Sequence, residues 1–143
     1  MNFRYLEFLS AALVATCMAN GAGAQDKTPD LTGTWICPHT IAIVVGSNPH
    51  KPGQSGITYS DVNSKIVIEE QKDRRFVGRV ETSFRTERLV GVIAPDFENG
   101  AMVDEDGSYT YEVHDANTLE ICYSHVLPDT RVVTCNNFTR TTK

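Results

Sequence analysis

From Thr32 onward, the chain consists of short runs rich in Val, Ile, Thr, Tyr and Phe, separated by clusters of Gly, Pro, Asp and Asn. These runs recur at intervals of roughly ten residues, a spacing typical of antiparallel all-β domains. No stretch shows the periodicity of an amphipathic helix. Eight runs are expected as strands, at residues 32–45, 64–71, 76–84, 87–94, 100–104, 108–114, 119–126 and 131–141.

The segments between the runs contain the residues of tight turns. They read QKDRR, APDFENG, DEDG, DANT and LPDT, in which Asp and Asn hydrogen-bond the local backbone and Pro presets φ. Connections this short join antiparallel neighbours. An antiparallel meander in one small domain removes its exposed edges by closing on itself. The sequence therefore predicts an all-β fold, an eight-stranded antiparallel up-and-down β-barrel.

One connection is much longer than the others. Residues 46–63, GSNPHKPGQSGITYSDVN, are rich in Gly and Pro and are interpreted as a loop between the first two strands. Loops of this length in a compact domain are usually functional or disordered. We expect this loop to lie across the mouth of the barrel as a lid.

The N-terminal region has the features of a secretion signal. Arg4 precedes an apolar run over residues 8–19, and the AGA that follows is an A-x-A cleavage pattern. We expect residues 1–24 to be a signal peptide and residues 25–143 to be one barrel domain of a secreted or periplasmic protein. Lipidation at Cys17 is the alternative, because LVATC weakly resembles a lipoprotein cleavage box. The apolar run is too short to span a membrane, and no span is expected elsewhere.

Charge and motif content exclude several functions. The chain has a formal net charge of −5 and its one short basic cluster is Arg74 with Arg75, so nucleic acid is not expected as a partner. No G-x-S-x-G, phosphate-binding glycine loop or H-E-x-x-H motif occurs. The carboxylates of MVDEDG, residues 102–107, lack the remaining ligands of a calcium loop and are interpreted as a turn. We expect no metal and no cofactor.

Once the signal peptide is removed, three of the four cysteines remain, in a compartment where pairing is expected. If the turn of the last hairpin centres between Pro128 and Asp129, Cys122 falls directly opposite Cys135 and near disulfide reach. We therefore predict that bridge. Cys37 is the remaining thiol, which is either buried or paired with another chain, so an oligomer is an open alternative.

The two ends of the mature domain resemble a known family. LTGTW at residues 31–35 and FTR at residues 138–140 are similar to motifs of the calycin superfamily, which includes lipocalins and avidins. The resemblance implies a lipocalin- or avidin-like barrel in which Trp35 closes the narrow end and Arg140, from the last strand, covers the indole ring. Biotin sites in that superfamily use several tryptophans, and this chain has one. Biotin is therefore not expected as the ligand.

Strand alternation extends this arrangement to the rest of the interior. If Trp35 points inward, so do Cys37 and His39, unless Pro38 introduces a bulge that shifts the phase. Arg140 anchors the last strand in the same way. The other side chains expected inside are Ile66, Ile68, Phe76, Val80, Phe84, Leu89, Ile93, Met102, Tyr109, Tyr111, Val113, Ile121, Tyr123, His125, Val132, Thr134, Asn136 and Phe138.

This interior is expected to be an apolar and aromatic cup with few polar groups. The leading hypothesis is an exported protein that binds a small apolar or aromatic molecule in the barrel, because concave apolar sites commonly hold small molecules. The side chains expected to contact the ligand are Cys37, His39, Phe76, Phe84, Tyr109, Tyr111, Tyr123 and His125.

Two alternatives belong to other classes of protein. His39 lies on the first predicted strand and His125 on the seventh, and only the eighth strand separates them in a closed barrel. Both side chains would therefore face one ligand, with Tyr123 below them. These groups suit proton transfer, and the first alternative is a cofactor-free isomerase, cyclase or lyase. The second is a protease inhibitor resembling small exported calycins, in which residues 25–31 enter the protease cleft. Two histidines are too few for a zinc site.

Overall fold

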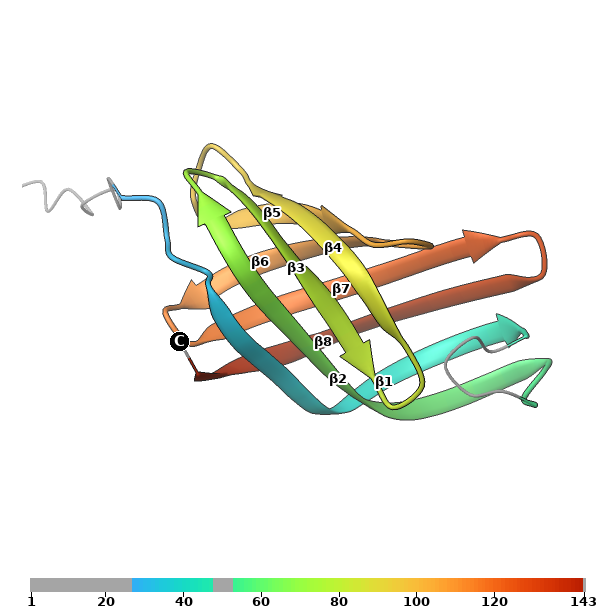
Figure 1. Cartoon of the computed structure of the whole chain (residues 1–143). Coiled ribbons are helices and arrows are strands. Elements are labelled where there is room, and N and C mark those ends of the chain that lie inside the picture. The colour runs from blue at the N-terminus through green and yellow to red at the C-terminus, as the bar shows by residue number, and fades with distance from the viewer. Residues whose placement is uncertain (1–26, 48–52, 143) are drawn as a thin grey trace, which may run out of the picture.

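The computed structural model describes residues 27–47 and 53–142, and this part of the chain contains eight strands and no helix. Each strand pairs antiparallel with its neighbours in chain order, and β1 pairs with β8, so the sheet closes into a barrel (Figure 1). The predicted fold class is thereby confirmed. The strands are β1 (Gly33–Gly46), β2 (Ile57–Lys72), β3 (Arg75–Thr82), β4 (Thr86–Ile93), β5 (Asn99–Val103), β6 (Ser108–Asp115), β7 (Thr118–Leu127) and β8 (Thr130–Thr142).

The segment expected to be a signal peptide, residues 1–24, lies outside the described residues together with Cys17. Within the described ranges, no helix has the length and hydropathy needed to cross a membrane. The barrel accounts for the described chain from Gly33 to Thr142.

The prediction of a loop over residues 46–63 is wrong in its second half. β2 begins at Ile57, and from there the segment continues the antiparallel ladder with β1. Ser60 is buried on the inner face, whereas Ile57 and Tyr59 are exposed. The usual alternation is thus reversed, which hides this part of the strand from a search for inward apolar residues. The expected lid falls partly on residues 48–52, which lie outside the described residues.

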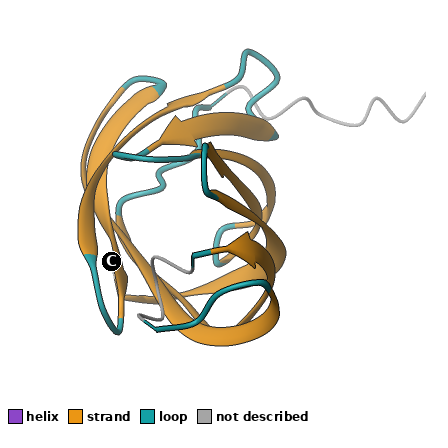
Figure 2. Cartoon of the chain, turned by 90° about the vertical axis from the view of Figure 1, so that its right-hand side faces the viewer, coloured by secondary structure: helices purple, strands orange, loops and turns teal. Residues whose placement is uncertain are grey.

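The strands differ in length, and this gives the barrel two unlike ends. β1, β2, β7 and β8 have 14, 16, 10 and 13 residues, whereas β5 has 5. The β1–β2 and β7–β8 hairpins therefore project beyond the short strands at one end, the mouth, which faces the viewer in Figure 2. The hairpin tips are joined by Ser47, whose N–H donates to Asp129 O at 3.3 Å and whose carbonyl accepts the Thr130 hydroxyl at 2.8 Å.

Trp35 fills the opposite end, the base. Its side chain is fully buried, and its Nε1 donates to Leu31 O at 2.9 Å. The guanidinium carbon of Arg140 lies 4.3 Å from the centroid of the Trp35 ring. The same guanidinium donates to the main-chain oxygens of Asp30 at 2.6 Å and Thr32 at 3.0 Å. One side chain thus covers the indole by a cation–π contact and fastens the N-terminal segment, as expected for this pair.

The inward side chains of the barrel pack into one apolar core that includes Trp35. Phe76 and Tyr111 meet edge to face within it, with their ring centroids 6.1 Å apart. All the side chains expected inside are buried or half-buried, except His39 and Phe84. The buried core comprises Leu31, Trp35, Cys37, Val44, Ile66, Ile68, Phe76, Val80, Leu89, Ile93, Met102, Tyr109, Tyr111, Leu119, Ile121, Tyr123, Val132 and Phe138.

The cysteines of the barrel follow the predicted register. Cys122 and Cys135 lie directly opposite each other in the β7–β8 ladder and form a disulfide, which confirms the prediction. Cys37 is buried and is the free cysteine of the described chain.

Removing the disulfide is expected to lower the free energy of unfolding by about 3 kcal/mol, because the bridge joins residues 13 apart and restricts the unfolded chain accordingly. Cys135 is exposed and Cys122 is half-buried, so serine at both positions removes little packing. Urea denaturation of the Cys122→Ser, Cys135→Ser double variant measures the loss, and reduced wild type should match it. A double variant as stable as the oxidised wild type would contradict this expectation.

Candidate ligand-binding site

Charged, phenolic and imidazole side chains meet at the mouth, where the short strands end. They come from the β3–β4 turn, the start of β4, the β5–β6 turn, the start of β6 and the second half of β7. Closure of the barrel brings these separate segments together. The mouth cluster, as we name it, consists of Arg85, Glu87, Asp104, Asp106, Tyr109, Tyr123 and His125.

Arg85 joins two carboxylates of the mouth cluster. Its Nη1 donates to Asp106 Oδ2 at 2.7 Å, and its Nη2 forms an ion pair with Oε1 of Glu87. Thr82 holds the turn that carries Arg85, because its hydroxyl accepts the N–H of Arg85 at 3.2 Å and its own N–H donates to Arg85 O at 2.9 Å. The planar fork of a guanidinium suits such a double contact. The single guanidinium of Arg85 therefore pairs with two carboxylates.

The β5–β6 turn positions its carboxylates by hydrogen-bonding its own backbone. Oδ1 of Asp104 accepts the N–H of Asp106 at 3.2 Å and that of Gly107 at 2.7 Å, and Oδ2 accepts the Tyr109 hydroxyl at 2.5 Å. A Cβ at Gly107 would lie 2.1 Å from a ring carbon of Tyr123, so the turn can approach that ring closely only with glycine here. The DEDG segment connects two strands as predicted, and its carboxylates also belong to the cluster.

Tyr123, His125 and Asp106 form a buried hydrogen-bonded group. The Tyr123 hydroxyl donates to Asp106 Oδ1 at 2.8 Å, and Nδ1 of His125 lies 3.2 Å from each of these two oxygens. Because the single hydroxyl hydrogen of Tyr123 goes to Asp106, Nδ1 is the donor toward these oxygens. His125 is 1% exposed, and its Nε2 has no hydrogen-bond partner among the described residues.

Burial and neighbouring charges move the pKa values of the cluster in different directions. The pKa of Glu87 is raised to about 7, first by burial and then by the charge of Asp106, against the opposing effect of Arg85. Burial alone would raise the pKa of Asp106, but hydrogen bonds from Tyr123 and Arg85 outweigh it and hold that pKa below its ordinary value. Burial raises the pKa of Tyr123 far above its ordinary value. Glu87 is therefore a group that changes its charge near neutral pH.

A cavity of about 60 Å³ lies inside the barrel beside the mouth cluster. Glu87 and Tyr123 of the cluster line it, and Ile66, Val80 and Ile121 provide an apolar wall. A buried water needs about 10 to 15 Å³ of such space, so the cavity has room for roughly four to six waters or a ligand of similar size. Sites for drug-sized molecules are larger, at about 300 to 1,000 Å³.

Several buried polar atoms in the mouth half have no hydrogen-bond partner within the described chain. They are Oγ1 of Thr40, Oγ1 of Thr58, Oγ of Ser60 and Nε2 of His125. Thr40 and Glu87 line the cavity itself. Buried polar atoms are nearly always hydrogen-bonded in folded proteins, to water or a ligand where no protein group is available. The cavity is thus suited to an occupant with hydrogen-bonding groups.

Family models, curated proteins and solved structures give no match to this chain.

Most of the side chains predicted to contact a ligand are inside the barrel. Those that are buried are Cys37, Phe76, Tyr109, Tyr111, Tyr123 and His125. Tyr109 and Tyr123 line the cavity, whereas Phe76 and Tyr111 pack against each other in the core. The aromatic part of the predicted cup is therefore largely filled by its own side chains.

The prediction that His39 points inward is wrong. The β1–β2 register shifts between Cys37 and Thr40, so Thr40 occupies the inward position and His39 is exposed. A bulge at this point is the alternative that Pro38 left open. His39 and His125 therefore do not face each other across one interior site.

The prediction that Phe84 points inward is also wrong. β3 ends at Thr82, and Phe84 lies in the turn to β4 with 55% of its surface exposed. Inward and outward positions alternate only within the ladder, so the pattern gives no direction for a residue in the turn.

Sequence reasoning missed Glu87, Arg85 and Asp106. Alternation counted from Leu89, which was expected inside, puts Glu87 on the inner face as well, and this was the available signal. Nothing local to Arg85 or Asp106 shows that their two turns meet. That contact depends on strand register across the barrel.

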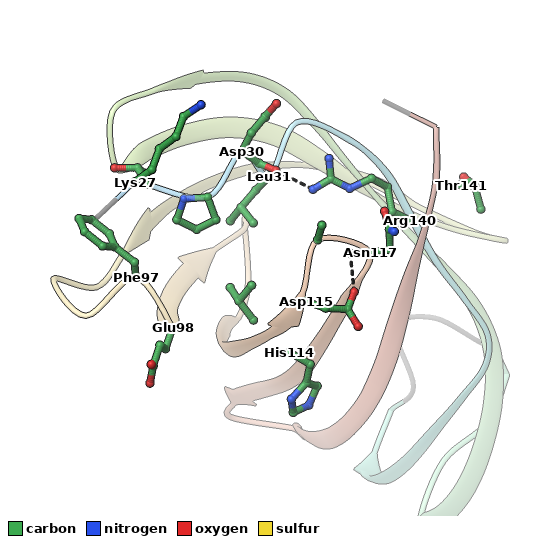
Figure 3. A pocket seen from close by; sticks show the side chains of 14 residues that line it. Lys27, Asp30, Leu31, Phe97, Glu98, His114, Asp115, Asn117, Arg140 and Thr141 are labelled. Atoms are coloured by element: carbon green, nitrogen blue, oxygen red, sulfur yellow. Dashed lines mark hydrogen bonds between the residues drawn. The ribbon is translucent and has the colours of Figure 1, made fainter. Parts of the chain in front are cut away.

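A second hollow, of about 560 Å³, lies at the base (Figure 3). Its walls include the N-terminal segment 27–31, Phe97 from the β4–β5 turn and His114 with Asp115 from the end of β6. Phe97 has a φ of 63°, which a bulky residue rarely adopts, and it packs against the core. The hollow has the size of a small-molecule site, but His114 and Asp115 are exposed to solvent. Among the described residues, the base has one buried polar atom without a hydrogen-bond partner, Nε of Arg140, whereas the mouth half has four such atoms and the buried carboxylate of Glu87.

Proposed function

We propose that this protein is exported and binds a small molecule inside the mouth half of its barrel. The disulfide between Cys122 and Cys135 fits an oxidising compartment, in agreement with the A-x-A pattern of the N-terminal region. The ligand occupies the cavity that Thr40 and Glu87 line. Its apolar part rests against Ile66, Val80 and Ile121, and its polar groups meet the buried oxygens.

The observation that carries this proposal is the set of buried polar atoms without partners, in particular Oγ1 of Thr40, which faces the cavity. Leaving one buried donor or acceptor unsatisfied costs about 1 to 3 kcal/mol. Apolar side chains would fill the same positions without that cost, as they do toward the base of the barrel. Polar side chains facing a cavity therefore favour a role in binding over a role in packing.

Filling the cavity is expected to abolish binding without unfolding the protein. Ala42 lines the cavity, and Ala42→Leu would place three more carbon atoms in it. Ala101 is exposed on β5, so Ala101→Leu is the matched control. Protein-observed NMR with a panel of probes of four to six heavy atoms measures binding through shifts at the cavity residues.

Wild type and Ala101→Leu should respond to the same probes, and Ala42→Leu should keep a native spectrum but respond to none. If no probe shifts the resonances of Thr40 or Ala42 in wild type, interior binding is refuted. Responses that survive in Ala42→Leu would place the ligand elsewhere.

The two alternatives have less support. The acid–base enzyme loses His39 from its proposed group, and the hydroxyl of Tyr123 is engaged with Asp106. For the inhibitor, the described part of the N-terminal segment is fastened to the barrel, because Gln71 accepts the N–H of Leu31 at 2.8 Å and donates to Pro29 O at 2.8 Å. Insertion of that part into a protease cleft would break these bonds.

A further inference from the structure

We infer that the molecule held in this cavity is a small organic cation, an ammonium ion carrying a few carbon or oxygen atoms, which pairs with the carboxylate of Glu87. The inference rests on the proposed function and names the class of its ligand. It is carried by the charges of the mouth cluster and by the one carboxylate that reaches the cavity.

The mouth cluster has more negative than positive groups. Glu87, Asp104 and Asp106 each present an oxygen within 4.8 Å of the others. Arg85 contributes one guanidinium and shares it between Glu87 and Asp106. Glu105, in the same turn as Asp104 and Asp106, adds to the negative potential at Glu87. A second positive charge at Glu87 would therefore be stabilised, and more strongly than in water because the site is buried.

Glu87 is the carboxylate of the cluster that lines the cavity. Asp104 and Asp106 do not line it, and their oxygens accept hydrogen bonds from the turn backbone, Tyr109, Tyr123 and Arg85. A cation in the cavity thus meets one carboxylate at 3% exposure and the hydroxyl oxygen of Thr40, which has no partner in the described chain.

This donor set favours an ammonium ion over a divalent metal. An ammonium group has three hydrogens, which suit one carboxylate and one or two hydroxyl oxygens, and its carbon atoms fit the wall formed by Ile66 and Val80. A calcium ion needs six to eight oxygen ligands and magnesium needs a near-octahedral set. In the cavity, either metal would find one carboxylate and an apolar wall.

Binding of the cation should depend on pH, because a proton competes with it for Glu87. The groups that act on Glu87 are Arg85, which favours its charged form, and Asp104, Glu105 and Asp106, which disfavour it together with burial. The pKa of Glu87 is raised to about 7. Its ionised fraction, and with it the affinity for the cation, rises about tenfold between pH 6 and pH 8.

Protein-observed NMR titration with ethanolamine and with ethylene glycol tests the inference. Both probes have four heavy atoms, but only ethanolamine is a cation between pH 6 and pH 8. Ethanolamine is expected to shift Thr40 and Glu87 resonances and to bind about tenfold more tightly at pH 8 than at pH 6. Ethylene glycol should bind at least tenfold more weakly at pH 8. Glu87→Gln should remove the pH dependence, whereas Glu105→Gln, at an exposed site in the adjacent turn, should change affinity by no more than about twofold.

The outcomes separate this inference from the proposed function. If neutral probes bind in the cavity and ethanolamine has no advantage over them at pH 8, the inference is overturned while interior binding stands. If neither charged nor neutral probes reach the cavity, both fail. Binding of calcium, magnesium or zinc ions that is lost in Glu87→Gln and displaces ethanolamine would assign the site to a metal and overturn the inference.

Discussion

Replacing Trp35 by alanine is expected to lower the free energy of unfolding by about 3 to 5 kcal/mol, the usual cost of removing a buried aromatic side chain. Trp35 is fully buried at the base of the barrel, and its indole N–H is bonded to Leu31 O. Loss of the ring also removes the surface on which Arg140 stacks. Because Arg140 holds the main chain of Asp30, the N-terminal segment should loosen together with the base.

Urea denaturation followed by circular dichroism measures this loss, since the variant has no tryptophan left for fluorescence. Tyr59→Ala is the matched control, because Tyr59 is an aromatic residue of the same sheet with 84% of its surface exposed. The control should lose no more than about 0.5 kcal/mol. A Trp35→Ala variant within about 1 kcal/mol of wild type would show that the base is not closed by this side chain.

The order of the strands and the closed sheet were predictable because their signals are local. Each turn carries Asp, Asn, Gly or Pro, and each strand has its own run of β-forming residues. The disulfide was predictable for the same reason, since the register of the β7–β8 hairpin follows from the LPDT turn. Once that turn is centred, Cys122 and Cys135 are opposed.

Whether a side chain points into or out of the barrel was predictable only where its strand stays regular. The bulge between Cys37 and Thr40 turns His39 outward. A proline in the sequence signals that such a register shift can occur, but it does not determine which neighbouring residue then points inward. The start of β2 was missed because its inward residues, Thr58 and Ser60, are polar. Apolar alternation identifies strands that contribute to a core, and this segment contributes to a polar interior instead.

The mouth cluster was the least predictable feature because its contacts join distant parts of the chain. Arg85 and Asp106 are 21 residues apart, and both lie in turns, where a charged residue is ordinarily solvated. A carboxylate such as Glu87 is expected at the surface unless its partners are known. Those partners follow from the register of four strands taken together, which no single segment of the sequence contains.

Glu87→Gln is expected to stabilise the protein at alkaline pH and to leave it nearly unchanged in acid. The pKa of Glu87 is raised in the folded protein to about 7 from an ordinary value of 4.5, which the unfolded chain retains. A carboxyl with a raised folded pKa contributes its full stability below pH 4.5, and this contribution is lost as the pH rises through about 7. The shift corresponds to a loss of up to about 3 kcal/mol in wild type. Glutamine has the same shape and cannot ionise, so the variant should not suffer this loss.

Urea denaturation at pH 4, 6 and 8 therefore gives a difference between variant and wild type that grows with pH. The variant should be within about 1 kcal/mol of wild type at pH 4 and more stable by up to about 3 kcal/mol at pH 8. Glu105→Gln, at an exposed position beside Asp104 and Asp106, should show a much smaller change because its carboxylate stays solvated. If Glu87→Gln is less stable than wild type at pH 8 and the deficit disappears at pH 4, the ion pair with Arg85 outweighs burial, and the folded pKa of Glu87 must then lie below 4.5.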